Sequence, residues 1–81
     1  MVTAGDPASY RFAEVAVPVP LRQTFTYRIP DELRGRIRPG SVVQVPFGRR
    51  RDEGFVVRLA DAAPVAAVKD ILDVEPEDFT L

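Results

Sequence analysis

The sequence predicts an all-β domain, a small five-stranded barrel that is closed or partly closed. Five short apolar runs follow one another at a spacing typical of strands joined by short turns, and no long segment has the 3.6-residue period of an amphipathic helix. No internal repeat is present. A chain of 81 residues can build only one modest core, and closing the sheet would remove edges that so small a domain could not otherwise cover.

The first two strands are predicted from side chains that alternate with a period of two. The first strand, residues 10–17, has valines at alternate positions and ends before Pro18, because proline has no N–H to donate to a ladder. The run TFTYRI, residues 24–29, places its aromatic and aliphatic residues on one face and its threonines and arginine on the other. This half-buried strand ends at Pro30.

The remaining segments predict a connection, a hairpin and a last strand. The connection has room for one helical turn before Pro39-Gly40, a pair that suits a type II turn. SVVQVPF (41–47) and GFVVRLAD (54–61) alternate like strands, and they predict a hairpin with a mobile basic tip at residues 48–53. VKDILDV (68–74) predicts a strand, with a short helix as the alternative.

The two ends of the chain differ from its middle in composition. Residues 1–9 are small and polar and predict a flexible tail, so the folded domain is expected at residues 10–75. Residues 76–81 predict the start of a linker or helix that leads to a following domain, with Thr80 as an N-cap. The apolar runs are too short to span a bilayer, and we expect a soluble cytoplasmic protein.

The residue types present do not favour catalysis. With neither cysteine nor histidine, the chain can form no disulfide and no thiolate or imidazole metal site, and the common pairs of nucleophile and base cannot be assembled. No glycine-rich phosphate loop is present. The adjacent carboxylates at 31–32 and 52–53 fall in predicted turns, where exposure to solvent explains them. We therefore expect a binding module, not an enzyme, with no metal and no cofactor of its own.

Charge is divided unevenly along the chain, although the net charge is only -1. Residues 22–51 hold eight arginines against two acidic residues, a balance of +6. Residues 59–81 hold one lysine against six acidic residues, a balance of -5. This asymmetry favours an anionic partner such as nucleic acid, and arginines that serve only solubility are the alternative.

Three stretches, taken in order, resemble one known family: AVPVPLRQTFTYRIP (16–30), RPGSVVQVPFGRRRDEGFVV (38–57) and VKDILDV (68–74). They are similar to the N-terminal 3′-end DNA-binding domain of the PriA replication-restart helicases, over residues 13–76. The resemblance implies an OB-like barrel that captures the 3′ end of a nascent strand at a stalled fork without sequence preference. It implies single-stranded or fork DNA, the remaining helicase domains and primosome proteins as partners, at the bacterial nucleoid. ATP, Mg²⁺ and zinc would belong to the parent helicase.

The resemblance places the pocket for the terminal nucleotide on Phe25, Thr26, Gly48 and Lys69. An aromatic ring stacks on any base, a glycine lets a ligand approach the backbone closely, and a lysine offers a compact cation to a phosphate. Thr26 stands where the family commonly has an aspartate, so a neutral hydrogen bond replaces a charge-assisted one. Without the family, Phe25 would be interpreted as a core residue, Gly48 as a turn requirement and Lys69 as a solvated charge.

Arg49, Arg50 and Arg51 are predicted to make secondary contacts with phosphates beyond the terminal nucleotide, from the flexible hairpin tip. Tyr27 and Phe47 are assigned to the barrel interior or its rim. Two other functions stay open at this point. One is a barrel that binds single-stranded nucleic acid only through its basic surface, and the other is a protein-interaction barrel with no nucleic-acid role.

Overall fold

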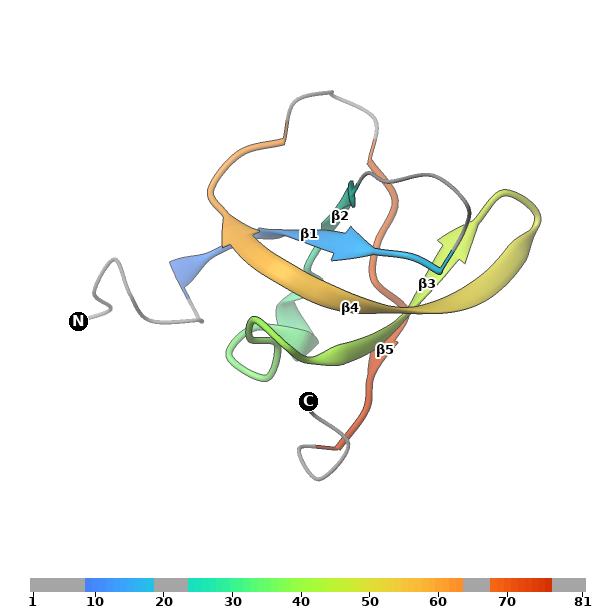
Figure 1. Ribbon diagram of the computed structural model, residues 1–81. Helices are drawn as coiled ribbons and strands as arrows, with labels where there is room; N and C mark the ends of the chain where they lie inside the picture. The colour runs from blue at the N-terminus through green and yellow to red at the C-terminus, as the bar shows by residue number, and fades with distance from the viewer. Residues whose placement is uncertain (1–8, 19–23, 64–67, 77–81) are drawn as a thin grey trace.

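A computed structural model describes residues 9–18, 24–63 and 68–76 of the chain (Figure 1). The strands are β1 (Phe12–Ala16), β2 (Thr24–Arg28), β3 (Val42–Phe47), β4 (Arg50–Ala60) and β5 (Asp73–Val74). A short 3₁₀ helix, η2 (Asp31–Leu33), lies in the connection between β2 and β3. The predicted all-β class with five short strands is confirmed.

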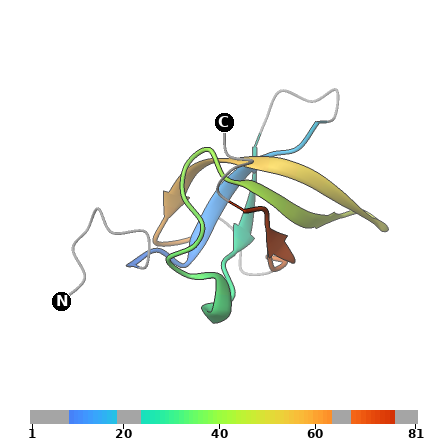
Figure 2. The same cartoon turned by 90° about the horizontal axis from the view of Figure 1, so that it is seen from below.

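The five strands form one antiparallel sheet in the order β2-β1-β4-β3-β5. β4 has 11 residues, and it pairs with β3 along its first half and with β1 along its second half, as Figures 1 and 2 show. The sheet is consistent with an OB-like fold but it is not closed. An isolated parallel bridge between Arg28 and Asp70 joins the edge strand β2 to the segment that precedes β5.

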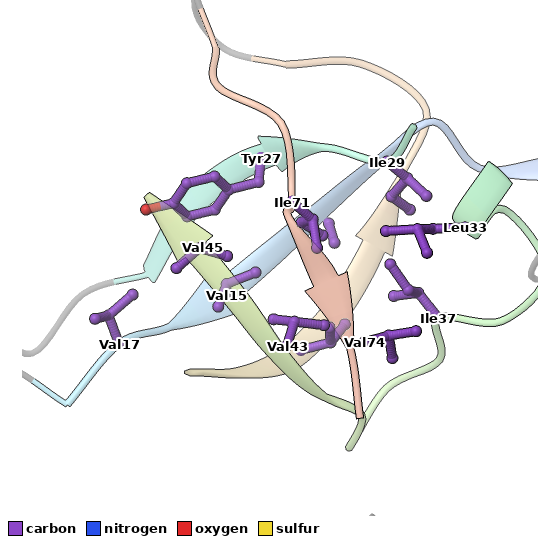
Figure 3. Close-up of a cluster of buried hydrophobic side chains, with 12 residues drawn as sticks. Val15, Val17, Tyr27, Ile29, Leu33, Ile37, Val43, Val45, Ile71 and Val74 are labelled. Atoms are coloured by element: carbon purple, nitrogen blue, oxygen red, sulfur yellow. The ribbon is translucent and has the colours of Figure 1, made fainter. Parts of the chain in front are cut away.

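Alternate side chains from the strands fill one core on the inner face of the curved sheet (Figure 3). The buried apolar residues are Ala13, Val15, Val17, Tyr27, Ile29, Leu33, Ile37, Val43, Val45, Val56, Ile71 and Val74. β1, β2 and β3 keep the predicted alternation, because each of them has one face turned to this core. Leu33 and Ile37 come from the connection, which therefore covers one end of the core in addition to linking two strands.

β4 departs from the predicted alternation because it contains a β-bulge. Its register with β1 shifts between Glu14 and Val15, which leaves Val57 as the extra residue on β4. As a result Val56 is buried, whereas Phe55 and Val57 are 46% and 51% exposed. The apolar run of this strand therefore does not mark a single buried face.

The segment 68–74 is extended, as predicted, although only its last two residues form a strand, β5. Its first part bonds to β2, where the N–H of Ile71 donates to the carbonyl of Arg28, and the N–H of Leu72 donates to a carbonyl of β3. This change of partner breaks the two-residue period. Ile71 and Val74 are consequently buried, and Leu72 is 48% exposed.

The hairpin turn is shorter than predicted. Only Gly48 and Arg49 separate β3 from β4, so the predicted tip that extends to residue 53 is wrong. Gly48 has a φ of 64°, as a type II′ turn requires at its first central residue. Arg50 and Arg51 belong to a paired strand, which fixes the direction of their side chains.

The predicted turn at Pro39-Gly40 is present. Gly40 has a φ of 93°, and the N–H of Ser41 donates to the carbonyl of Arg38 at 2.9 Å. A positive φ at the third residue together with this bond is the pattern of a type II turn.

The predicted tail lies outside the described residues except for Ser9, and so does Thr80 in the predicted start of a helix. Within the described ranges, no helix is long and apolar enough to cross a membrane.

Candidate nucleic-acid interface

One edge of β2 is only partly covered. β2 is the last strand on its side of the sheet, and it pairs with β1 on its other side. At the uncovered edge, the N–H of Arg28 donates to the carbonyl of Lys69, and the carbonyl of Arg28 accepts from the N–H of Ile71, both at 2.9 Å. These two bonds make the parallel bridge that holds the segment 68–71 against the end of β2.

Thr26 directs its backbone N–H and C=O to the same edge as Arg28, because alternate residues of a strand point these groups to the same side. The N–H of Ile29 points to the other side, where it donates to the carbonyl of Arg11 at 2.7 Å. On this edge, the part of the chain that the structure describes pairs with β2 at Arg28 and not at Thr26. Thr26 therefore presents one backbone donor and one backbone acceptor to a ligand lying along this edge.

The end of β3 approaches the inner face of β2 and brings two aromatic rings together. The rings of Phe25 and Phe47 meet edge to face, with centroids 5.0 Å apart and planes at 74°. The hydroxyl of Tyr27 donates to the carbonyl of Pro46 at 2.8 Å. Both phenylalanines are partly exposed and pack against the core. We call Phe25 and Phe47 the aromatic floor. Phe25 directly precedes Thr26 in β2.

Gly48 directly follows Phe47 and is exposed in the hairpin turn. A Cβ placed on Gly48 would meet no atom within 4 Å, so its positive φ, and not crowding, requires a glycine there. Because Phe47 touches Phe25, the turn lies near the start of the free edge of β2.

Lys69 lies at the other end of the same edge. Its carbonyl is bonded to Arg28, which is about 10 Å from Phe25 at the usual rise of a strand. Nε and Nη2 of Arg28 donate to the two carboxylate oxygens of Asp70 at 2.7 and 2.9 Å, and this ion pair fixes the segment beside β2. The hydrogen bonds from Arg28 lower the pKa of the Asp70 carboxyl. The side chain of Lys69 itself is exposed.

The side chain of Thr26 faces the outer side of the sheet, away from the aromatic floor. Thr26 is opposite Glu14, which is in turn opposite Arg58, and Arg58 forms an ion pair with Glu14. A cavity of about 400 Å³ at this place is lined by Glu14, Thr26, Arg58, Ala60, Ala62 and Ala63. Since neighbouring side chains of a strand point to opposite faces, only a ligand that lies across the free edge can touch both Phe25 and Thr26.

Ion pairs neutralise several of the arginines. The pairs are Arg28 with Asp70, Arg34 with Asp31, Arg50 with Asp52 and Arg58 with Glu14. Within the described ranges, no carboxylate pairs with Arg49 or Arg51. The acidic end of the sequence supplies Asp70 to the arginine-rich middle, so the charge asymmetry along the chain is partly cancelled in space.

The four residues that the resemblance names are thus arranged around one feature, the free edge of β2. The structure brings Phe25 and Gly48 to one end of it through Phe47, and it places Lys69 at the other end. Sequence reasoning missed the backbone groups of Thr26. The alternation in TFTYRI assigns side chains to faces, but which strand forms the edge of a sheet depends on pairings with distant segments.

Comparison with known proteins gives two matches that agree with this fold. The family of 3′ DNA-binding domains (3′BD) of PriA matches residues 14–81. The replication restart protein PriA of Bacillus subtilis (strain 168) is 41% identical over 73 residues, which cover 80% of this chain and 9% of that protein. The chain therefore spans only a small part of the length of this curated relative. From these matches we conclude that the chain belongs to the family of PriA 3′ DNA-binding domains.

Proposed function

We propose that this chain captures the 3′ end of a single DNA strand at stalled replication forks, without sequence preference, as a module of a replication-restart helicase. The observation that carries the proposal is the free edge of β2, where Phe25 precedes Thr26 and no described residue bonds to the outward backbone groups of Thr26. Membership of the family supports DNA as the ligand and its 3′ end as the part bound.

The terminal base would stack on Phe25 and bond to the backbone of Thr26. Stacking on an aromatic ring tolerates every base and is worth about 1–3 kcal/mol. Each of the four bases has a hydrogen-bond donor beside an acceptor on its Watson–Crick edge, so a single backbone N–H and C=O can serve them all. This contact does not depend on the side chain at position 26, and a threonine there leaves it intact.

Gly48 and Lys69 would hold the sugar and phosphate. Around Gly48 no atom occupies the space of a Cβ, so a sugar can approach the backbone of the turn closely. The exposed ammonium of Lys69 is a compact cation at the other end of the edge and suits a phosphate oxygen. A nucleotide that spans the edge would then touch all four residues.

Phe25→Ala tests the stacking role. Loss of one stack of about 1–3 kcal/mol should lower the affinity for a short oligonucleotide with a free 3′-OH by about 5- to 150-fold, measured by fluorescence anisotropy. Phe55→Ala is the matched control, because Phe55 lies on the outer face and is 46% exposed, and it should bind as the unchanged protein does. Phe25→Leu keeps apolar packing without a flat ring, and it serves if the alanine variant is unstable. Equal binding by the Phe25 variants and the Phe55 control would refute the end pocket.

A blocked end tests whether the terminus itself is bound. A 3′-phosphate adds bulk and charge where the strand should stop, and we expect it to weaken binding relative to a 3′-OH. Equal affinity for both ends, together with a log–log salt slope of about -0.7 per phosphate contacted, would instead favour a barrel that binds only through its basic surface.

The activity of the whole protein is a proposal as well, because the chain corresponds to 9% of its relative. We propose that the parent is a helicase that uses ATP, Mg²⁺ and zinc, works with primosome proteins at the nucleoid, and receives from this module only its hold on the 3′ end. The module would need no cofactor, so its affinity for DNA should be the same with and without EDTA.

A further inference from the structure

The three consecutive arginines after Gly48 are not equivalent in the structure. Arg49 is a turn residue, whereas Arg50 and Arg51 are the first two residues of β4. Neighbouring residues of a strand point to opposite faces, so Arg50 and Arg51 must extend from opposite sides of the hairpin. A cluster that looks uniform in sequence is therefore divided by the fold.

Arg50 is on the face that carries the aromatic floor. It is directly opposite Phe47 across the hairpin, and Phe47 touches Phe25. Directly opposed residues of an antiparallel pair have side chains on the same face, close enough to act on one ligand. Arg51 is opposite Pro46 instead and lies on the outer face.

Asp52 holds the guanidinium of Arg50 on this inner face. Nη2 of Arg50 is 3.3 Å from a carboxylate oxygen of Asp52, two residues along the same face of β4. The ion pair leaves the Arg50 side chain 72% exposed. A guanidinium has five N–H donors, so most of them remain available to a further anion.

We infer that Arg50, and neither Arg49 nor Arg51, joins Lys69 in binding the phosphate of the terminal nucleotide. The inference rests on the proposed function, since it takes the base of that nucleotide to stack on Phe25. A nucleotide stacked on the aromatic floor has its phosphodiester within a nucleotide's length of the rings, on the face from which Arg50 extends. The guanidinium can bind two phosphate oxygens at once, which a more distant positive charge cannot do.

The test compares Arg50→Ala with Arg51→Ala, which remove the same charge from adjacent residues of one strand. Each variant is titrated with a single-stranded oligonucleotide and with the same oligonucleotide carrying a neutral methylphosphonate at its last linkage. In the unchanged protein, the neutral linkage should weaken binding by about 3- to 10-fold. Arg50→Ala should lose most of this difference and keep only the part that Lys69 contributes, and Arg51→Ala should retain all of it.

Several controls separate this inference from its alternatives. A methylphosphonate placed far from the 3′ end should affect both variants equally, because it reports only the general charge of the surface. Arg50→Lys should restore part of the difference, since it keeps the charge but loses the planar fork. Both arginines are exposed, so melting temperatures should not change. If Arg50→Ala keeps the full penalty, or Arg51→Ala loses it equally, the inference is wrong. A neutral result for Phe25→Ala would instead refute the stacking site itself.

Discussion

Gly54→Ala should destabilise the domain because β4 passes very close to β1 at this residue. Gly54 is buried, and a Cβ built on it would lie 2.7 Å from the backbone oxygen of Ala16 and 2.7 Å from Cγ1 of Val15. Both distances are below any normal carbon contact, and one of the atoms belongs to the backbone, so β1 itself must move. Overpacking of this kind costs about 1–3 kcal/mol.

The expected net loss is smaller than the packing cost. Replacing glycine by alanine also restricts the unfolded chain, which contributes about 0.4–1 kcal/mol of stability wherever the native φ suits alanine. Gly54 is not among the glycines with positive φ, so this gain applies. We therefore expect a net destabilisation of about 1–2 kcal/mol, which lowers the melting temperature of a domain this size by about 5–15 °C. Thermal and urea unfolding followed by circular dichroism measure it.

Position 48 provides the contrast, because its backbone conformation requires a glycine, whereas position 54 requires one for lack of space. The Cβ position of Gly48 is empty, but its φ of 64° costs an alanine about 1–2 kcal/mol. Asparagine tolerates this conformation, so Gly48→Asn should recover much of the stability lost in Gly48→Ala, whereas Gly54→Asn should be worse than Gly54→Ala. A Gly54→Ala variant as stable as the unchanged protein would contradict these expectations. So would asparagine that is more stable than alanine at position 54 and not at position 48.

Three further predictions concern two groups that hold β2 to its surroundings, Tyr27 and Asp70. Burial, and then the charge of Asp52, raise the pKa of Tyr27, so its hydroxyl should stay protonated above pH 10. The contribution of Tyr27 to stability is therefore complete below pH 10 and is lost as the pH rises through the raised pKa. An absorbance titration of the tyrosine would follow this change. Tyr27→Phe should lose about 1 kcal/mol in urea unfolding, because it removes the hydrogen bond to Pro46. The pKa of Asp70 is lowered, so stability depends on pH in the opposite direction. The stability that the Asp70–Arg28 pair contributes is complete above about pH 4 and is lost as the pH falls further. The melting temperatures of Asp70→Asn and the unchanged protein should therefore differ at pH 7 and converge as the pH falls below the lowered pKa of Asp70, and a constant difference would contradict this account.

The sequence predicts local structure well wherever one face of a strand is buried. TFTYR is a strand, as its alternation indicates, and it ends at Arg28, one residue earlier than Pro30 predicts. The pattern fails in β4, because the bulge at Val57 inserts a residue that no local signal marks. It fails again after Ile71, where the chain leaves β2 and joins β3. Both failures arise from pairing partners that are far away in sequence.

The candidate site is predictable in its residue types and less so in its geometry. The family resemblance supplies Phe25 and Gly48, but it does not show that Phe47 is the residue that brings them close. The sequence predicts the arginine triplet in a flexible tip, whereas the turn has only two residues and Arg50 and Arg51 are paired in β4. Whether Arg50 and Arg51 are flexible or paired depends on the length of the turn. A glycine followed by charged residues is compatible with both a two-residue turn and a six-residue tip.

The extent of one short ladder determines whether the proposed site exists at all. The parallel bridge at Arg28 covers the end of β2, and among the described residues it does not continue to Thr26. If the ladder continued two residues further, the N–H and C=O of Thr26 would bond to the neighbouring segment and no ligand could use them. An uncovered edge normally invites pairing with other chains, and a strand of five residues limits that risk. The proposed capture of a 3′ end at β2 therefore requires an incompletely closed sheet, because full closure would occupy the backbone groups that are proposed to bind any base.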